Sequence, residues 1–411
     1  MKKTLCWVAS CLLILGSVGL TGCGQDQEAA LADLQSAEQS AGPSNDEAGS
    51  ADLASVSPSR EAGTNHLNET VSATFGIDLE IDPTHVTKLP VVEAEPFDFE
   101  LDKVKAALFP GQEPDVIEDE GPDPGYSLRS GDIWSIFSSS DRFSNLAYVA
   151  PYSEQVFDVC AAYGVAGIAE EANSIAAEFK EAQAVPYATP AEAETEFINL
   201  LRELGIDNAG DITVYALDHT VLQSVAHERA AEQEAQNPAE GKTRREYKDE
   251  WTSEDDCYLL IARCMVNDVP VKQQDTVGPA DEYAINGSHA AALLNAAGLQ
   301  YLDISMFVQN PVNGDSESIL PVEQALEAVK LKYGDLITEN KSTVVDAELI
   351  YSPLPSGDRL ELTPAWSFTI LEQQPPVEFE GELVQNEPHE VYETVNAITG
   401  TEFMANQGDW K

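Results

Sequence analysis

The sequence predicts an α+β fold in which antiparallel sheets each pack against helices, after a disordered N-terminal tether. Three observations support this prediction: a capped helix after residue 189, an amphipathic helix after residue 321, and strands with alternating apolar residues that follow each helix. Helices and strands in this order are typical of folds in which helices cover one face of a sheet. The segment 190–309 is a candidate for a looser copy of the C-terminal unit.

The first residues have the organisation of a secretory signal. Lys2 and Lys3 give a basic start, and residues 6–20 form an apolar run too short to span a membrane. Leu20-Thr21-Gly22-Cys23 resembles the lipobox of bacterial lipoproteins. The resemblance implies cleavage after residue 22 and diacylglycerol on the Cys23 thiol, which would anchor the mature chain on the outer face of the cell membrane. An ordinary cleaved signal with an incidental cysteine is the alternative.

Residues 24–72 are rich in Ala, Ser, Gly, Asp and Glu and contain no aromatic residue. Such a segment buries too little apolar surface to offset its loss of chain entropy, so we expect residues 23–73 to be disordered. A flexible chain of about 50 residues has an end-to-end distance of about 40 Å. The segment is therefore expected to act as a tether, and the fold is expected to begin near Phe75.

Turn signals divide the remainder into three regions, residues 74–188, 189–316 and 317–411. The N-terminal region is predicted to contain a helix over 102–109, an acidic loop over 111–123, a hairpin of 132–137 and 143–149, and a helix over 170–182.

The middle region opens on Thr189-Pro190-Ala191-Glu192, which has the pattern of a helix capping box with proline at the first helical position. Apolar residues at helical spacing follow, and Gly205 ends the helix. We then expect a strand over 212–217, a helix over 220–236, and strands over 257–266 and 299–308. The run 257–266 is apolar on both faces, which indicates a central strand.

The C-terminal region, residues 317–411, has the clearest pattern. Val322, Ala325, Leu326 and Val329 form one helical stripe. Alternating apolar residues predict strands over 343–351 and 360–370, joined by a turn at Pro355-Ser-Gly-Asp358, and a last strand over 392–398.

This unit resembles the PepSY-like domains in three segments: Gln324-Ala-Leu-Glu-Ala-Val-Lys330, Leu362-Thr-Pro-Ala-Trp-Ser-Phe368, and the strand end Val395-Asn-Ala-Ile-Thr-Gly400. Asn396 stands where aspartate is commoner in that family. The chain is also similar to extracytoplasmic accessory proteins that restrain a cell-wall sensor kinase. The resemblance covers residues 318–403, and more loosely 190–403. It implies a binding or inhibitory module and transfers no catalytic residue.

Charge narrows the choice of partners. Removal of residues 1–22 leaves 20 basic and 72 acidic residues, a formal charge of −52. Such a surface repels nucleic acid and anionic lipid headgroups and attracts cations, cationic peptides or a basic protein face. Solubility alone is the simpler explanation of the acidity.

Three cysteines accompany Cys23 in the mature chain: Cys160, Cys257 and Cys264. Seven steps along a strand separate Cys257 from Cys264 by about 23 Å and place them on opposite faces, so they are not expected to form a disulfide with each other. Buried free thiols are the preferred interpretation, and a bridge from Cys160 to one of them is the alternative.

Patterns that carry metal or catalytic chemistry are weak. His389-Glu390 lacks the second histidine of a zinc-protease helix, because Glu393 occupies that position. Asp218, His219 and His227 make a thin metal site. The acidic loop lacks the spacing of a calcium-binding loop, so we interpret its residues as solvated charges: Glu113, Asp115, Glu118, Asp119, Glu120 and Asp123. We therefore predict no catalytic residue, metal or cofactor.

One basic cluster, Lys242, Arg244, Arg245 and Lys248, stands out in so acidic a chain. It is a candidate partner-binding patch. The simpler interpretation is local pairing with Asp249, Glu250, Glu254 and Asp255.

The leading hypothesis is a non-enzymatic surface lipoprotein that binds a protein or peptide through a sheet face or an open strand edge and regulates a sensor kinase or protease. Two alternatives remain: a cell-envelope hydrolase or metal-dependent enzyme without a recognisable motif, and a solute-binding lipoprotein. Converging carboxylates or histidines in a deep pocket would favour the enzyme, and two equal lobes around a hinge would favour solute binding.

Overall fold

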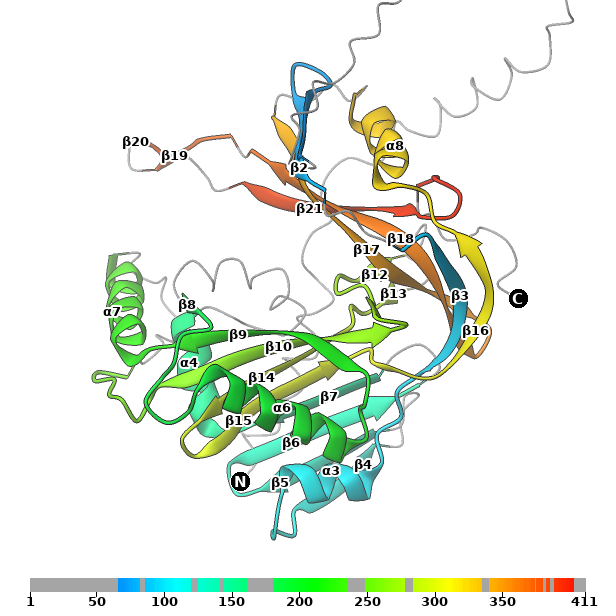
Figure 1. Ribbon diagram of the computed structural model, residues 1–411. Helices are drawn as coiled ribbons and strands as arrows, with labels where there is room; N and C mark the ends of the chain where they lie inside the picture. Colours follow the sequence, from blue (N-terminus) through cyan, green and yellow to red (C-terminus); the bar gives the residue numbers. More distant parts are fainter. Residues whose placement is uncertain are drawn as a thin grey trace, which may run out of the picture. The chain divides into compact units, whose positions relative to one another are not determined.

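Strand pairing in the computed structural model produces two large sheets and two small hairpins (Figure 1). The structure describes residues 66–81, 86–119, 125–140, 144–160, 180–235, 248–277, 284–334, 340–373, 375–379, 382–384 and 388–402. The α+β prediction of antiparallel sheets packed against helices is confirmed, with one parallel pair of strands as an exception.

The larger sheet runs in the order β4-β5-β6-β7-β15-β14-β10-β9-β8, and β11 pairs with β10 outside this path. Its strands are β4 (Asp115–Asp119), β5 (Gly125–Ser130), β6 (Ile133–Ser139), β7 (Ser144–Val149), β8 (Lys180–Glu181), β9 (Ala209–Leu217), β10 (Cys257–Val266), β11 (Val269–Pro270), β14 (His289–Asn295) and β15 (Gly298–Ser305).

The smaller sheet runs in the order β1-β2-β17-β18-β3-β16, and β21 also pairs with β18. Its strands are β1 (His66–Thr70), β2 (Phe75–Glu80), β3 (Lys88–Pro96), β16 (Val308–Ser318), β17 (Ser342–Ser356), β18 (Arg359–Glu372) and β21 (His389–Asn396). The two hairpins are β12 (Thr276–Val277) with β13 (Ala284–Ile285), and β19 (Val377–Phe379) with β20 (Glu382–Val384).

Helices cover both faces of the larger sheet. Tyr258 and Leu260 of β10 belong to the core that includes side chains of α3 (Leu101–Leu108) and α6 (Pro190–Leu204). Leu259 and Ile261 alternate with them and pack with α4 (Pro151–Cys160) and α7 (His219–Ala235). This arrangement confirms the predicted central strand, because β10 is buried on both faces.

One helix covers the smaller sheet. The predicted stripe of α8 (Val322–Gly334) packs on apolar side chains of β2, β17 and β18. Trp366 and Phe368 are buried in this core, and the Trp366 indole N–H donates a hydrogen bond to the Leu320 carbonyl at 2.9 Å. The amphipathic pattern therefore predicted both the helix and the face that it buries.

Contacts through β17 join the two sheets. The buried Tyr351 hydroxyl accepts from the side-chain amide of Asn267, directly after β10, at 3.2 Å, and its backbone carbonyl accepts from the Lys272 N–H at 2.9 Å. The Arg263 guanidinium of β10 binds both carboxylate oxygens of Glu348. These contacts connect strands that lie far apart in the sequence.

Several sequence predictions need correction. Residues 66–70 of the predicted tether form β1, which pairs with β2 across a short turn. The acidic loop contains β4, and the predicted strand 299–308 ends at 305, since β16 begins at 308. The last residues of the predicted helix 170–182 include β8, while residues 170–179 lie outside the described part of the chain. Each error concerns a strand defined by a distant or edge partner rather than by its own apolar pattern.

The predicted domain borders separate strands that pair with each other. β7 pairs with β15, and β3 with β16, across the border at 188/189, and β3 pairs with β18 across the border at 316/317. The described residues all lie within one compact unit, residues 58–411. Turn signals show where the chain reverses, but they carry no information on which distant strand becomes a neighbour.

We predict that Thr189→Ala lowers the free energy of unfolding by about 1 kcal/mol, the usual contribution of an N-cap. The Thr189 side chain accepts from the Glu192 N–H at 3.3 Å, and the Glu192 carboxylate accepts from the Thr189 N–H at 2.8 Å. Urea unfolding measures the change. The control is Thr195→Ala in the same helix, where Ala is the better helix former and little stability should be lost. Equal losses in both variants would contradict the capping box.

Candidate functional site

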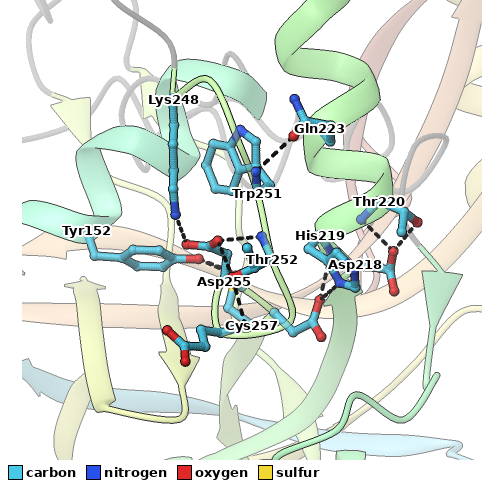
Figure 2. A network of polar contacts seen from close by, with 12 residues as sticks. Tyr152, Asp218, His219, Thr220, Gln223, Lys248, Trp251, Thr252, Asp255 and Cys257 are labelled. Atoms are coloured by element: carbon cyan, nitrogen blue, oxygen red, sulfur yellow. Dashed lines mark hydrogen bonds and ion pairs between the residues drawn. The ribbon is translucent and has the colours of Figure 1, made fainter.

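A group of carboxylates and one histidine gathers where β9 ends and β10 begins (Figure 2). These strands are antiparallel neighbours, and Leu217 is paired with Cys257. The residue after β9, Asp218, and the residue before β10, Asp256, therefore lie at the same end of the sheet. His219 begins α7 directly after Asp218.

Asp256 and His219 make the closest contacts of this group. One carboxylate oxygen of Asp256, Oδ1, accepts from the His219 backbone N–H at 2.7 Å and lies 2.8 Å from its Nδ1. The Asp256 side chain is 0% exposed, and that of His219 is 29% exposed. The second carboxylate oxygen, Oδ2, is buried without a hydrogen-bond partner. Burial of a carboxylate oxygen without compensation is unfavourable, so this oxygen requires explanation.

Asp218 caps α7. Its carbonyl accepts from the Leu222 N–H at 2.9 Å, and its Oδ1 accepts from the Thr220 N–H at 2.8 Å and contacts the Thr220 hydroxyl. Partial burial raises the pKa of Asp218, but the hydrogen bonds from Thr220 and the adjacent His219 outweigh burial and hold the pKa below its ordinary value. Asp218 is thus ionised near the positive end of the helix.

The donor atoms of Asp218, His219 and Asp256 all lie within 4.8 Å of one another. Imidazole nitrogen and carboxylate oxygen are both ligands of divalent first-row metals. The three side chains come from two chain segments that the sheet holds together, so the group is a property of the fold.

A second polar network holds the segment before β10 in place (Figure 2). The Asp255 carboxylate contacts the Lys248 ammonium and accepts from the Thr252 N–H at 2.7 Å. The Tyr152 hydroxyl of α4 donates to the Asp255 carbonyl at 2.5 Å. The backbone N–H of Trp251 donates a hydrogen bond to the side-chain oxygen of Gln223 in α7 at 2.8 Å. These contacts fix residues 248–256 against both helices, which positions Asp256.

Lys248 is engaged inside this network. Its ammonium pairs with Asp255 and lies 5.3 Å from the centre of the Trp251 ring. This contact corresponds to the local-pairing interpretation of the basic cluster. Lys242, Arg244 and Arg245, the other members of that cluster, lie outside the described residues, as does Cys23.

The other residues that the sequence suggested as metal or catalytic candidates lie outside the group formed by Asp218, His219 and Asp256. His227 contacts Gln223 at 2.8 Å and is not a member of the Asp218–His219 group. His389, Glu390 and Glu393 lie on β21, which begins three residues before the predicted strand 392–398, and Glu393 accepts from Lys332 at 2.8 Å. Sequence reasoning missed Asp256. Its only signal was its position before a central strand that pairs with β9, which requires knowledge of the strand order.

Cys257 and Cys264 are free, buried thiols on opposite faces of β10. Their arrangement agrees with the predicted spacing, and the side chain of Cys160 lies outside the described residues. Burial raises the pKa of Cys257 to about 12 and that of Cys264 to about 11. Both thiols are therefore neutral at physiological pH and poor nucleophiles.

Comparisons with known proteins establish likeness of fold. No protein-family model matches the chain, and no curated protein matches it. The chain is similar to the crystal structure of an uncharacterized protein from Eubacterium rectale ATCC 33656, with a TM-score of 0.59 and 16% sequence identity. The match covers 83% of this chain and 94% of that protein. At this identity the match supports the two-sheet α+β fold and nothing about function.

Among the described helices, none has the length and apolar character needed to cross a bilayer.

We predict that neither β10 thiol reacts with an aromatic disulfide reagent at pH 8 in the folded protein. The test uses the mature chain with Cys23→Ser and Cys160→Ser, so that Cys257 and Cys264 are the remaining thiols. Unfolding in guanidinium chloride should release both. Burial raises both thiol pKa values above the ordinary 9.0, so the neutral thiols contribute to the stability of the folded state below pH 9.0. This contribution is lost as the pH rises through about 11 for Cys264 and about 12 for Cys257. Rapid reaction of the folded protein would contradict this burial.

Proposed function

We propose that this chain is a non-enzymatic lipoprotein, anchored through Cys23 on the outer face of the cell membrane, that binds a protein or peptide partner. The signal and lipobox pattern support the anchor, and the acidic composition supports a basic partner. The observation that carries the binding proposal is the exposed edge of the larger sheet at β4.

β4 ends the strand order of the larger sheet, and β5 is its one neighbour among the described strands. The pairing with β5 is regular over five residue pairs, from Asp115 with Arg129 to Asp119 with Gly125. Val116 is 41% exposed and Ile117 is 67% exposed. Adjacent residues of a strand point to opposite faces, so β4 exposes large apolar side chains on both faces. An edge of this kind is suited to the addition of another strand.

The residues around these side chains define the partner. Asp115 and Glu118 flank them on the strand and are exposed, and Asp119 follows. Opposite charges placed across neighbouring strands stabilise pairing by about 0.2–1 kcal/mol per pair. We therefore propose an extended segment in which two adjacent apolar residues, opposite Val116 and Ile117, are flanked on both sides by lysine or arginine.

The other described edges are less suitable. β16 shifts register against β3 between Gln309 and Val312 and again between Asn313 and Ser316, and Pro311 within it lacks an N–H donor. β8 has only two residues, and neither β1 nor β21, which pairs with β18 alone among the described strands, has an apolar side chain exposed as fully as those of β4.

The PepSY resemblance supports a regulatory role. α8, β17, β18 and β21 follow one another as helix, strand, strand and strand, and α8 packs on β18. Strands from earlier in the chain, β2, β3 and β16, extend this sheet beyond the resembling segment. In keeping with the resemblance, the proposed partner is an envelope sensor kinase or protease.

We predict that the double variant Val116→Ser with Ile117→Ser loses the partner. Burial of a fully exposed aliphatic side chain contributes about 1.5–3 kcal/mol, so partial burial of both should strengthen binding by roughly tenfold or more. The mature protein, tagged at its C-terminus, is crosslinked in cells and recovered from solubilised envelopes. Partner recovery should fall at least tenfold in the variant.

Leu331→Ser is the matched control. Leu331 is 74% exposed, and it lies on α8, the helix that packs on the smaller sheet and not on the sheet that contains β4. Partner recovery should be unchanged in this control, and neither set of substitutions should lower the melting temperature by more than a few degrees. Undiminished recovery in the β4 variant would overturn the proposed docking edge.

A further inference from the structure

We propose that Asp218, His219 and Asp256 bind one first-row divalent cation, Zn²⁺ or Mn²⁺. The site lies in the larger sheet at the start of α7 and is separate from the proposed partner-binding edge at β4. One imidazole nitrogen and two carboxylates, all within 4.8 Å of one another, supply three donors.

The buried carboxylate of Asp256 is the strongest argument for a cation. Its Oδ2 has no hydrogen-bond partner, and the side chain is 0% exposed. The other oxygen of the same carboxylate already faces the imidazole of His219 at 2.8 Å. A cation bound between the imidazole and the carboxylate would compensate the charge that burial leaves without sufficient solvation.

Nearby basic side chains do not supply this compensation. Lys248, the nearest lysine along the chain, pairs with Asp255. Among the described residues, His219 is the one basic group in ion-pair distance of Asp256. A cation bound to the His219 Nδ1 atom would therefore replace the contact that this nitrogen makes with Asp256 at 2.8 Å.

The framework around the site holds the donors in place. Asp218 and His219 are fixed by the first turn of α7, and Asp256 is fixed by β10 and by the Asp255 network. Donor atoms of a tetrahedral Zn²⁺ site lie about 3.4 Å apart, so a donor separation of up to 4.8 Å has to close by about 1.4 Å or less. The His219 Nδ1 and Asp256 Oδ1 atoms, which lie 2.8 Å apart, have to separate by about 0.6 Å. His219 is 29% exposed, which leaves access for water as a further ligand.

The ligand types favour transition metals. Ca²⁺ and Mg²⁺ prefer oxygen ligands alone, whereas imidazole together with carboxylates suits Zn²⁺ and Mn²⁺. Metal binding at this site does not require the partner proposed for β4, because this chain supplies all three donors.

Isothermal titration of the metal-free, untagged mature protein with ZnCl₂ and with MnCl₂ tests the site. We expect one equivalent of Zn²⁺ or Mn²⁺ to bind, and the melting temperature to rise with metal concentration. His219→Gln and Asp256→Asn should each weaken binding by at least the roughly tenfold loss that follows removal of an outer-shell partner. Asp256→Asn keeps the shape of the side chain, and His219→Gln provides a second test if the first variant does not fold.

His66→Gln is the matched control, because the His66 imidazole lies 2.8 Å from Asp78 at the surface without a third donor in the group. This variant and His227→Gln should bind the metal as the wild type does. Equal affinity in all variants, tighter binding of CaCl₂ than of either metal, or no binding would overturn the proposal. No binding would assign the contact to a His219–Asp256 ion pair alone.

Discussion

Burial of β10 on both faces is the constraint on which the larger sheet depends. Tyr258 and Leu260 enter the core beneath α3 and α6, while Leu259 and Ile261 pack with α4 and α7. A strand buried in this way must satisfy every backbone group within the sheet, and β9 and β14 provide the two neighbours. The strand order then extends outward on both sides, and β4 is left at one end. The end of β10 that carries Asp256 lies beside the end of β9 for the same reason.

Basic residues are so few in this chain that most carboxylates cannot form an ion pair with lysine or arginine. The chain has 22 lysines and arginines against 72 aspartates and glutamates. Several basic side chains are engaged by carboxylates: Lys248 with Asp255, Lys330 with Glu69, Lys332 with Glu393, Arg263 with Glu348, and Arg359 with Glu95. Among the described residues, the carboxylates not paired with lysine or arginine include Asp115 and Glu118 of β4 and the buried Asp256, whose basic partner is His219. Both proposals draw on this excess of negative charge, one for a basic peptide and one for a metal cation.

The sequence predicted the local elements well where apolar side chains carried the pattern. The capping box at Thr189, the stripe of α8 and the doubly buried run 257–266 all form as expected. It failed for strands at the edges of the sheets whose own residues are mostly polar or acidic. β1 has few apolar residues and depends on β2, and β4 looked like a solvated loop because its acidic residues hid a paired strand. The candidate metal site was predicted in part. Asp218 and His219 were recognised from the sequence, but the third predicted donor was His227, whereas the third donor in the structure is Asp256.

Site-specific photocrosslinking in living cells is the most direct test of partner binding at β4. A photoreactive amino acid replaces Ile117 on β4, and the same amino acid replaces Leu331 on α8 as the reference position. Binding at β4 predicts one adduct of defined mass from position 117, formed with an envelope protein through a segment in which basic residues flank two apolar residues, and none of that mass from position 331. An adduct from position 331 alone, or the absence of any adduct at 117 in cells rich in the protein, would contradict a partner bound at β4.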